Sequence, residues 1–260
     1  MCPIVELSHV YTRIGASVVH EDINLQVTRG EIFALVGGSG AGKSVLLREI
    51  IMLQAPTSGS IRVLGQEVVG IDERGALELR RRFGVLFQRP ALFDGLTVAE
   101  NVAIPFREHT SLNRTLITKL AALKLAFAGF PAEGMHRYPS ELSPSMRKRA
   151  ALARAIALDP ELLFLDEPST GLDPYSAREL DDLIQQLKES LGLTVFIVTH
   201  DLDSLWRATD RVAVLGDRSI RGVGTMEELT QSEDPLIRVY FYGPRGQSAW
   251  QRARDRGASA

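Results

Sequence analysis

The segment Gly37-Gly-Ser-Gly-Ala-Gly-Lys-Ser44 decides how the rest of this chain is interpreted. It fits the pattern G-x-x-x-x-G-K-[ST] and lies between the run Glu31-Ile-Phe-Ala-Leu-Val36 and helix-spaced apolar residues from Val45 to Leu53. A buried strand, a glycine-rich loop and a helix, in that order, are the context that a phosphate-binding loop requires. Glycines let successive backbone N–H groups point at one anion, and the helix N-terminus adds about half a positive charge. The segment therefore predicts a nucleoside-triphosphate site, in preference to a glycine-rich turn that happens to precede a lysine.

Two side chains of this loop have expected roles toward a nucleotide. Lys43 is placed to reach the β- and γ-phosphates, and the Ser44 hydroxyl to hold Mg²⁺. Tyr11 is either an aromatic residue that stacks on adenine or an ordinary half-exposed strand tyrosine. The nucleotide-binding residues predicted in the loop are Gly37, Gly38, Ser39, Gly40, Ala41, Gly42, Lys43 and Ser44.

Composition excludes several other classes of protein. The chain has 260 residues, 24% of them charged, and a formal net charge of -2, so nothing suggests general affinity for nucleic acid. The single Cys2 excludes a disulfide framework and a cysteine-based zinc ribbon, and it fits a reducing compartment. No apolar run approaches the roughly 18 residues of a membrane span, and residues 1–10 lack the pattern of a signal peptide. We expect a cytoplasmic protein that can still bind a membrane partner.

The pattern along the chain indicates an α/β fold. Short apolar pieces in residues 3–36, 61–65 and 83–87 predict strands, and residues 73–82 predict a helix. From residue 162 onward, buried strands alternate with helices, which implies a largely parallel sheet covered by helices. Between them, residues 91–160 carry helical patterns, starting with a capping box at Thr97 and Glu100. This block predicts a helical lobe inserted between strands, and residues 243–260 predict a loose polar tail.

Polar residues at the ends of three predicted strands extend the nucleotide site. Asp166 and Glu167 follow a run of four apolar residues, where the first carboxylate can support Mg²⁺ and the second can polarise an attacking water. Such a pair by itself is usually surface charge. Together with the phosphate loop it becomes strong evidence for a nucleotide-hydrolysing site. Gln88 and His200 also follow strands, at the sheet edge where ligands lie in open α/β folds. We expect Gln88 to contact Mg²⁺ or the water, and His200 to lie beside Asp166 and Glu167.

Taken together, these segments resemble an ATP-binding cassette (ABC) ATPase over nearly the whole chain. The matching motifs are Walker A Gly37–Ser44, Q-loop Gln88, signature Leu142-Ser-Pro-Ser-Met146, Walker B Leu162–Asp166 with Glu167, D-loop Ser169-Thr-Gly-Leu-Asp173 and switch His200. The resemblance implies a P-loop NTPase (RecA-like) parallel-sheet core at 1–90 and 161–242, an antiparallel β lobe, and an inserted helical subdomain at 91–160. It also implies ATP and Mg²⁺ as cofactors, with Ser44, Gln88 and Asp166 around the metal.

The same resemblance implies a head-to-tail homodimer. Two ATP molecules would lie between Walker A of one subunit and the signature of the other, where Ser143 and Ser145 would contact the nucleotide. Glu167 would be the general base and His200 would contact the γ-phosphate. The catalytic residues are therefore expected to be Glu167, His200 and Gln88.

The chain departs from the family pattern at two places. Pro144 and Ser145 replace the two glycines of the usual signature, which removes one N–H and adds a side chain where the γ-phosphate approaches. Ser143 can still cap the helix, and proline suits a first helical turn, so we expect hydrolysis to persist. The family's adenine-stacking aromatic aligns nearer Ile14 than Tyr11, which leaves the stacking residue open.

A narrower resemblance links the chain to the Mla/Mce-type ATPases, the MlaF-like branch. It rests on the segments 101–110, 149–158 and 234–241. The resemblance implies phospholipid transport across the Gram-negative envelope, with the ATPase peripheral to the cytoplasmic side of the inner membrane. The implied partners are a second ATPase subunit, a membrane permease and a periplasmic MCE-domain protein, with the C-terminal tail touching the partner ATPase.

Two other classes of function stay open. A non-transport ABC protein of DNA repair or translation usually carries coiled coils or tandem cassettes, and this chain has one cassette without heptads. A nucleotide-sensing module that binds ATP and barely hydrolyses it is suggested by Pro144 and Ser145. Neither the cargo nor the direction of transport follows from the sequence.

Overall fold

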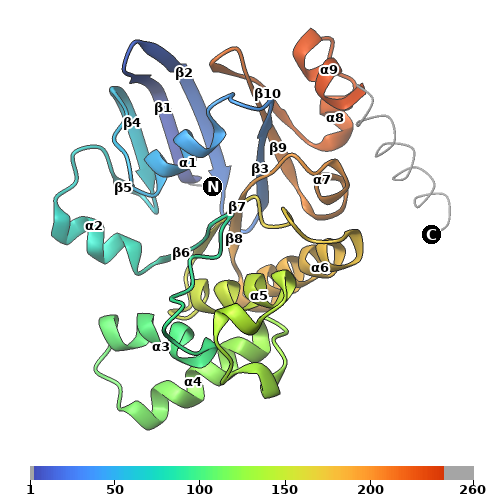
Figure 1. Cartoon of the computed structure of the whole chain (residues 1–260). Helices are drawn as coiled ribbons and strands as arrows, with labels where there is room; N and C mark the ends of the chain where they lie inside the picture. The colour runs from blue at the N-terminus through green and yellow to red at the C-terminus, as the bar shows by residue number, and fades with distance from the viewer. Residues whose placement is uncertain (1–2, 243–260) are drawn as a thin grey trace. The chain divides into compact units, whose positions relative to one another are not determined.

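A computed structural model describes residues 3–242 of the chain (Figure 1). Its contacts divide the chain into two compact units. The first contains residues up to 76 and from 196 onward, and the second contains residues 77–195. The expected helical subdomain at 91–160 stays a prediction, and the expected tail at 243–260 lies outside the described residues.

The first unit contains an antiparallel sheet, as expected. Its strands are β1 (Pro3–Ile14), β2 (Ser17–Thr28), β4 (Ser58–Val63) and β5 (Gln66–Glu67), in the order β2-β1-β4-β5. Residues 3–28, which predicted several short strands, form two long ones. The pairing of β1 with β2 shifts register between Leu7 and Val10, where His9 has a φ of 51°. This irregularity interrupts the alternation of apolar residues, which is why the sequence pattern looked broken.

The first unit also contains the strand that leads to the phosphate loop. β3 (Ile32–Gly37) is buried at every residue and pairs in parallel with β9 (Arg211–Gly216), which pairs antiparallel with β10 (Ser219–Gly224). β8 (Thr194–Val198) crosses the boundary between the units, and the order within this unit is β10-β9-β3-β8. A strand buried on both faces shows a continuous apolar run, which explains why it was recognisable in sequence. Helix α1 (Lys43–Ile50) follows the loop.

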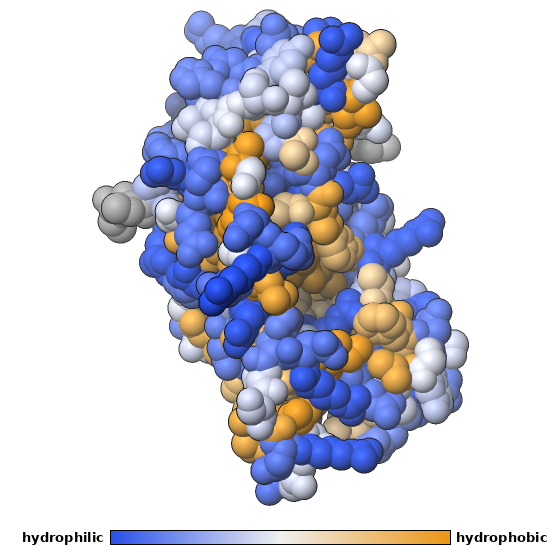
Figure 2. Space-filling view, turned by 90° about the vertical axis from the view of Figure 1, so that its left-hand side faces the viewer, coloured by the Kyte–Doolittle hydropathy of each residue, from blue (hydrophilic) through white to orange (hydrophobic). Residues whose placement is uncertain are grey.

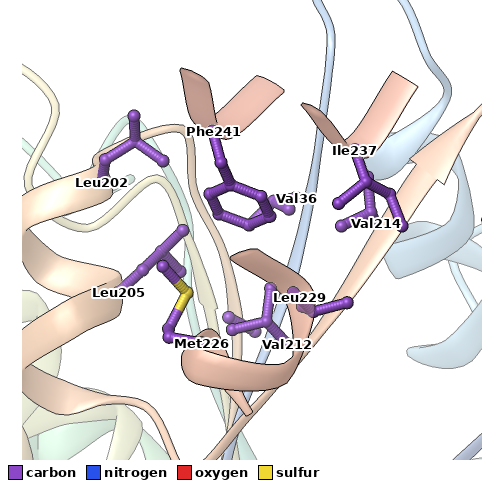
Figure 3. Close-up of a cluster of buried hydrophobic side chains, with 10 residues drawn as sticks. Val36, Leu202, Leu205, Val212, Val214, Met226, Leu229, Ile237 and Phe241 are labelled. Atoms are coloured by element: carbon purple, nitrogen blue, oxygen red, sulfur yellow. The ribbon is translucent and has the colours of Figure 1, made fainter. Parts of the chain in front are cut away.

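Three short helices pack on these strands through one apolar cluster. They are α7 (Leu202–Ala208), α8 (Met226–Thr230) and α9 (Pro235–Tyr242). Figure 3 shows Phe241 and Ile237 of α9 pointing toward the other side chains of the cluster. Its further members include Val36, Leu205, Val212, Val214, Met226 and Leu229. The cluster joins the strand before the phosphate loop to the last helix of the described chain.

The second unit combines two parallel strands with four longer helices. β6 (Phe83–Leu86) pairs in parallel with β7 (Leu162–Asp166), and the order is β8-β7-β6. The rings of Phe83 and Phe164 pack edge to face, with their centroids 5.4 Å apart. The helices are α3 (Val98–His109), α4 (Arg114–Phe127), α5 (Pro144–Ala155) and α6 (Pro174–Leu191), with α2 (Glu73–Arg80) at the boundary of the two units.

Local signals set the ends of these helices. The capping box of Thr97 and Glu100 is present, which confirms the expected start of α3. α5 begins at Pro144, because Pro139–Glu141 forms a separate 3-10 turn and Ser143 caps the helix. Together the parallel pairs, the antiparallel sheet and the helices confirm the predicted α/β fold class.

A helix that spans a membrane needs a minimum length and hydropathy. Within residues 3–242, no helix is long and apolar enough to cross a membrane. Hydrophilic and hydrophobic residues are interspersed on the face in Figure 2.

Candidate nucleotide site

The phosphate loop lies between β3 and α1, and two of its glycines are required by sterics. Gly37 has a φ of 153°, and a Cβ there would lie 2.2 Å from the carbonyl oxygen of Leu215 on β9. Gly42 has a φ of 98°, and a Cβ there would lie 2.6 Å from Nε2 of His20 and 2.8 Å from Cγ1 of Val19. A side chain at Gly37 would collide with β9, and a side chain at Gly42 would collide with β2 of the antiparallel sheet. The loop can therefore keep this path only with glycine at both positions.

Lys43 and Ser44 occupy the first turn of α1. The Lys43 amino group donates hydrogen bonds to the carbonyls of Gly37, at 2.9 Å, and Gly38, at 3.0 Å, so its charge lies over the loop. The N-cap residue is Gly42, which has no side chain to accept from the first-turn N–H groups. These N–H groups and the Lys43 ammonium form a positive end suited to a phosphate group.

A buried polar cluster, which was not predicted from the sequence, contacts the loop at Gly42. His20, Glu49 and Thr12 are each at most 1% exposed. His20 Nε2 lies 3.1 Å from the Gly42 carbonyl oxygen, and its Nδ1 lies 3.5 Å from Glu49 Oε2. The Thr12 hydroxyl donates to Glu49 Oε1 at 2.7 Å. The cluster joins α1 to β1 and β2 and contacts the loop at Gly42. A charged residue in the apolar pattern of α1 was its only sequence signal.

His200 and Tyr11 also belong to the first unit. The Thr199 N–H donates to the carbonyl of Leu35 on β3 at 3.3 Å. Leu35 lies two residues before the phosphate loop, and His200 directly follows Thr199. The His200 side chain is exposed. Tyr11 is half-buried in β1 and pairs with Ser58, while Ile14 at the end of β1 is 47% exposed. Adenine stacking by Tyr11 stays a prediction.

In the second unit, Gln88, Asp166 and Glu167 meet at one edge. β6 and β7 are parallel and Leu86 is paired with Leu165, so the residues that follow both strands emerge at the same end. Gln88 is exposed there. Glu167 has a φ of 49°, a left-handed conformation that is uncommon for a residue with a side chain. The Thr170 hydroxyl donates to Glu167 Oε2 at 3.2 Å, and the Thr170 N–H donates to the Glu167 carbonyl at the same distance.

A buried lysine that no local sequence pattern indicates joins these two segments. Lys148 on α5 is 4% exposed, and its amino group donates to the Gln88 carbonyl at 2.7 Å and to the Glu167 carbonyl at 3.3 Å. Burial lowers the pKa of Lys148 from its ordinary value, and the nearby carboxylates of Asp166 and Glu167 oppose that change. Both contacts are long-range in sequence, so no local pattern announces them.

The altered signature forms a regular helix start. Ser143 has extended backbone angles and its hydroxyl accepts from the Met146 N–H at 3.2 Å, while Pro144 occupies the first helical position. The expected capping by Ser143 and the expected place of Pro144 in the first turn are both confirmed. The exposed Ser143 and half-buried Ser145 leave the helix start accessible.

Each unit therefore gathers one part of the predicted site. The first holds the phosphate loop and His200, and the second holds Gln88, Asp166, Glu167 and the signature. The meeting of the two parts around one nucleotide stays a prediction. Among residues 3–242, no group of three or more His, Cys, Asp or Glu residues could hold a metal ion by itself.

Comparison with known proteins agrees with these motifs. The ABC transporter family matches residues 20–170. The intermembrane phospholipid transport system ATP-binding protein MlaF of Haemophilus influenzae is 41% identical over 92% of this chain and 90% of its own. The probable ribonucleotide transport ATP-binding protein mkl of Mycobacterium tuberculosis is 36% identical over 93% of this chain and 67% of its own.

A solved structure shares the fold as well. It is a dimeric ATP-binding cassette in a post-hydrolysis state bound to ADP and Pi, with a TM-score of 0.79, 28% identity, and coverage of 85% of this chain and 98% of that one. The family match spans more than half of the present chain. This chain therefore belongs to the ABC transporter ATP-binding family, and it is an ATPase.

Proposed function

We propose that this ATPase energises phospholipid transport of the Mla/Mce type across a Gram-negative envelope. The observation that carries the proposal is the likeness to a phospholipid-transport ATPase across nearly the full length of both chains. The mycobacterial relative is named for ribonucleotide transport, which makes that cargo the second candidate. The ATPase is separate from the path of the cargo, so transport must be measured directly.

We propose further that two copies hydrolyse ATP in a head-to-tail homodimer. In each site the phosphate loop of one subunit holds the nucleotide, and Ser143 and Ser145 of the other close over the γ-phosphate. Glu167 acts as the general base, and His200 and Gln88 contact the γ-phosphate and the attacking water. The exposed, capped start of α5 supports this role, because helix N-terminal N–H groups are suited to phosphate.

The donor atoms that the proposal assigns to Mg²⁺ fit that ion. They are the Ser44 hydroxyl, the Gln88 amide oxygen and the Asp166 carboxylate, all hard oxygen ligands. Mg²⁺ usually takes one or two carboxylates together with substrate phosphates, which suits a chain whose described part has no acidic cluster sufficient for a metal alone. When bound, Mg²⁺ would neutralise negative charge on the phosphates.

The proposed partners place this protein on the cytoplasmic side of an inner membrane. They are a second copy of the chain, an integral permease and an MCE-domain lipid-binding protein. In the second unit, Arg80, Arg81 and His109 line a groove beside the apolar Val85 and Pro105. Arg154 also lines the groove and donates to the carbonyls of Pro90 and Ala91, so a partner seated there would lie next to the segment after Gln88.

Purification from membranes tests the proposal. Tagged full-length protein, solubilised in detergent, should bring down a permease and an MCE-domain protein with bound phospholipid. In proteoliposomes, ATP should drive movement of a labelled phospholipid, and Lys43→Ala should abolish it because the phosphates lose their cation. Movement of a labelled ribonucleotide instead would favour the second candidate. Recovery of the ATPase in the soluble fraction alone would contradict both.

The nucleotide-sensing alternative predicts a different rate of ATP hydrolysis. It rests on Pro144 and Ser145, which alter the place where the signature meets the γ-phosphate. Under that alternative the assembled complex binds ATP but releases almost no phosphate. Steady-state phosphate release by the purified complex separates the two.

A further inference from the structure

Lys148 is a buried cation in the second unit that the family motifs do not include. It lies on α5, five residues after Ser143, and it is 4% exposed. A buried ammonium must find acceptors, because burial without hydrogen bonds is costly for a charged group. The acceptors that Lys148 finds are the carbonyl oxygens of Gln88, at 2.7 Å, and Glu167, at 3.3 Å. One side chain therefore bonds to the backbone of two proposed catalytic residues.

The first of these contacts holds the segment that carries Gln88. Gln88 lies in a bend beyond the end of β6, outside any strand or helix. Two side chains of α5 hold this segment, because Lys148 donates to the Gln88 carbonyl and Arg154 donates to the carbonyls of Pro90 and Ala91. The position of the bend is thus set by the helix that begins with the signature.

The second contact holds an unusual backbone conformation. Glu167 has a φ of 49°, a left-handed backbone conformation that is unfavourable for any residue with a Cβ. Its carbonyl accepts from Lys148 and from the Thr170 N–H, and its side chain accepts from the Thr170 hydroxyl. These bonds hold the backbone and the side chain of Glu167 in place directly after the end of β7. Residues in such conformations persist only where their surroundings hold them.

We propose that Lys148 is a positioning residue for ATP hydrolysis, which fixes the Gln88 segment and the Glu167 backbone in one arrangement on α5. The inference rests on the proposed roles of Glu167 and Gln88. In this role Lys148 acts through the two backbone carbonyls to which it donates. Loss of its donors lets both segments drift, and a displacement of about 1 Å at a catalytic group can cost about a hundredfold in rate.

The experiment compares two buried lysines of the second unit. Lys148→Met removes the donors and keeps most of the side-chain volume, and Lys148→Arg restores donors. Lys124→Met is the matched control, because Lys124 is 3% exposed and bonds to Asp159, away from the proposed catalytic residues. Each full-length variant is purified in the complex that the wild-type protein forms, and its phosphate release, its affinity for ATP and its melting temperature are measured.

The expected result is a fall in kcat while KM stays nearly unchanged. Lys148→Met should lower kcat about 10- to 100-fold, with KM and the ATP dissociation constant changed by less than about threefold, since the phosphate loop is untouched. Lys148→Arg should recover kcat to within about fivefold of wild type, because its guanidinium can donate to both carbonyls. Lys124→Met should lower the melting temperature, and its kcat per folded molecule should stay within about twofold of the wild-type value.

Three results would overturn the inference. They are a wild-type kcat in Lys148→Met, an equal loss of kcat in Lys124→Met, or an Arg variant as slow as the Met variant. If Lys148→Met does not fold, Lys148→Gln decides, since its shorter amide reaches at most one carbonyl and an undiminished kcat would contradict the role. Glu167→Gln is measured alongside: if it is as active as wild type, the base is assigned wrongly and this inference fails with it. If it is inactive while Lys148→Met is not, only Lys148 is assigned wrongly.

Discussion

At the scale of residues, the phosphate loop is shaped by what lies behind it as much as by its own glycines. His20, Glu49 and Thr12 form a buried polar cluster, and His20 contacts the carbonyl of Gly42. Thr12 donates to Glu49 Oε1, and His20 Nε2 meets the Gly42 carbonyl, whereas His20 Nδ1 and Glu49 Oε2 face each other at 3.5 Å without a hydrogen bond. The contacts that are made tie β1, β2 and α1 together behind the loop. The loop is therefore held both by steric exclusion at Gly42 and by a contact from the antiparallel sheet.

A substitution at Gly42 tests this steric requirement. Gly42→Ala should weaken ATP binding by at least tenfold, because its Cβ would collide with His20 and Val19 and force the loop to move. Gly65→Ala is the matched control: its φ of 81° is similarly positive, but a Cβ there meets nothing within 4 Å. The control should lose about 1–3 kcal/mol of stability from backbone strain and keep its affinity for ATP. Calorimetric titration measures both affinities, and equal affinities in the two variants would contradict the account.

The sequence revealed local features of the site and concealed the distant ones. The phosphate loop, the Asp166-Glu167 pair and the Ser143 cap are short contiguous patterns with a stated physical reason. His20 contacts Gly42 across 22 residues, and Lys148 contacts Gln88 across 60. These contacts exist only after the strands and helices have packed. No periodicity or spacing in one sequence specifies them.

At the scale of elements, α5 connects the altered signature to the proposed catalytic edge. Its first turn contains Pro144, which the helix tolerates because proline has a suitable φ and lacks only an N–H that would have no partner within the helix. α6 starts at an Asp173 cap and ends at Gly192, which has a left-handed conformation. By contrast, β1 was expected as fragments because register shifts interrupt its alternation.

Restoring the glycines of the signature tests whether the altered helix start works. Replacing Pro144 and Ser145 together by glycine should change the ATPase rate of the complex by less than about tenfold, or ~1.4 kcal/mol in the barrier. The reason is that Ser143 already caps α5 and the helix start is accessible. Steady-state phosphate release by wild type and the double variant is the assay. A hundredfold rise would favour the nucleotide-sensing alternative.

At the scale of the whole molecule, the proposed site draws on both units. The first unit supplies the phosphate loop and His200, and the second supplies Gln88, Asp166 and Glu167. Within the first unit, residues distant in sequence share one core, since Val36 and Phe241 belong to the same apolar cluster (Figure 3). The stability of the strand that leads to the phosphate loop therefore depends on the last described helix.

Truncation of Phe241 tests that dependence. Phe241→Ala should lower the free energy of unfolding by about 3–5 kcal/mol, because the ring is 3% exposed within the cluster. Val239→Ala on the same helix is the control, since Val239 is 72% exposed and its loss should cost less than about 0.5 kcal/mol. Urea unfolding of the full-length variants gives both values. A loss below 1 kcal/mol in Phe241→Ala would show that α9 contributes little to this core.

The most direct test of the central claim, that this chain hydrolyses ATP with Glu167 as the general base, is phosphate release by Glu167→Gln beside wild type. The variant should bind ATP with wild-type affinity, because the phosphate loop is unchanged. Its rate should fall about 10²–10⁴-fold, since the amide cannot take the proton of the attacking water. With ATP present, the variant should accumulate as a dimer in size-exclusion chromatography. A rate within twofold of wild type would contradict the claim.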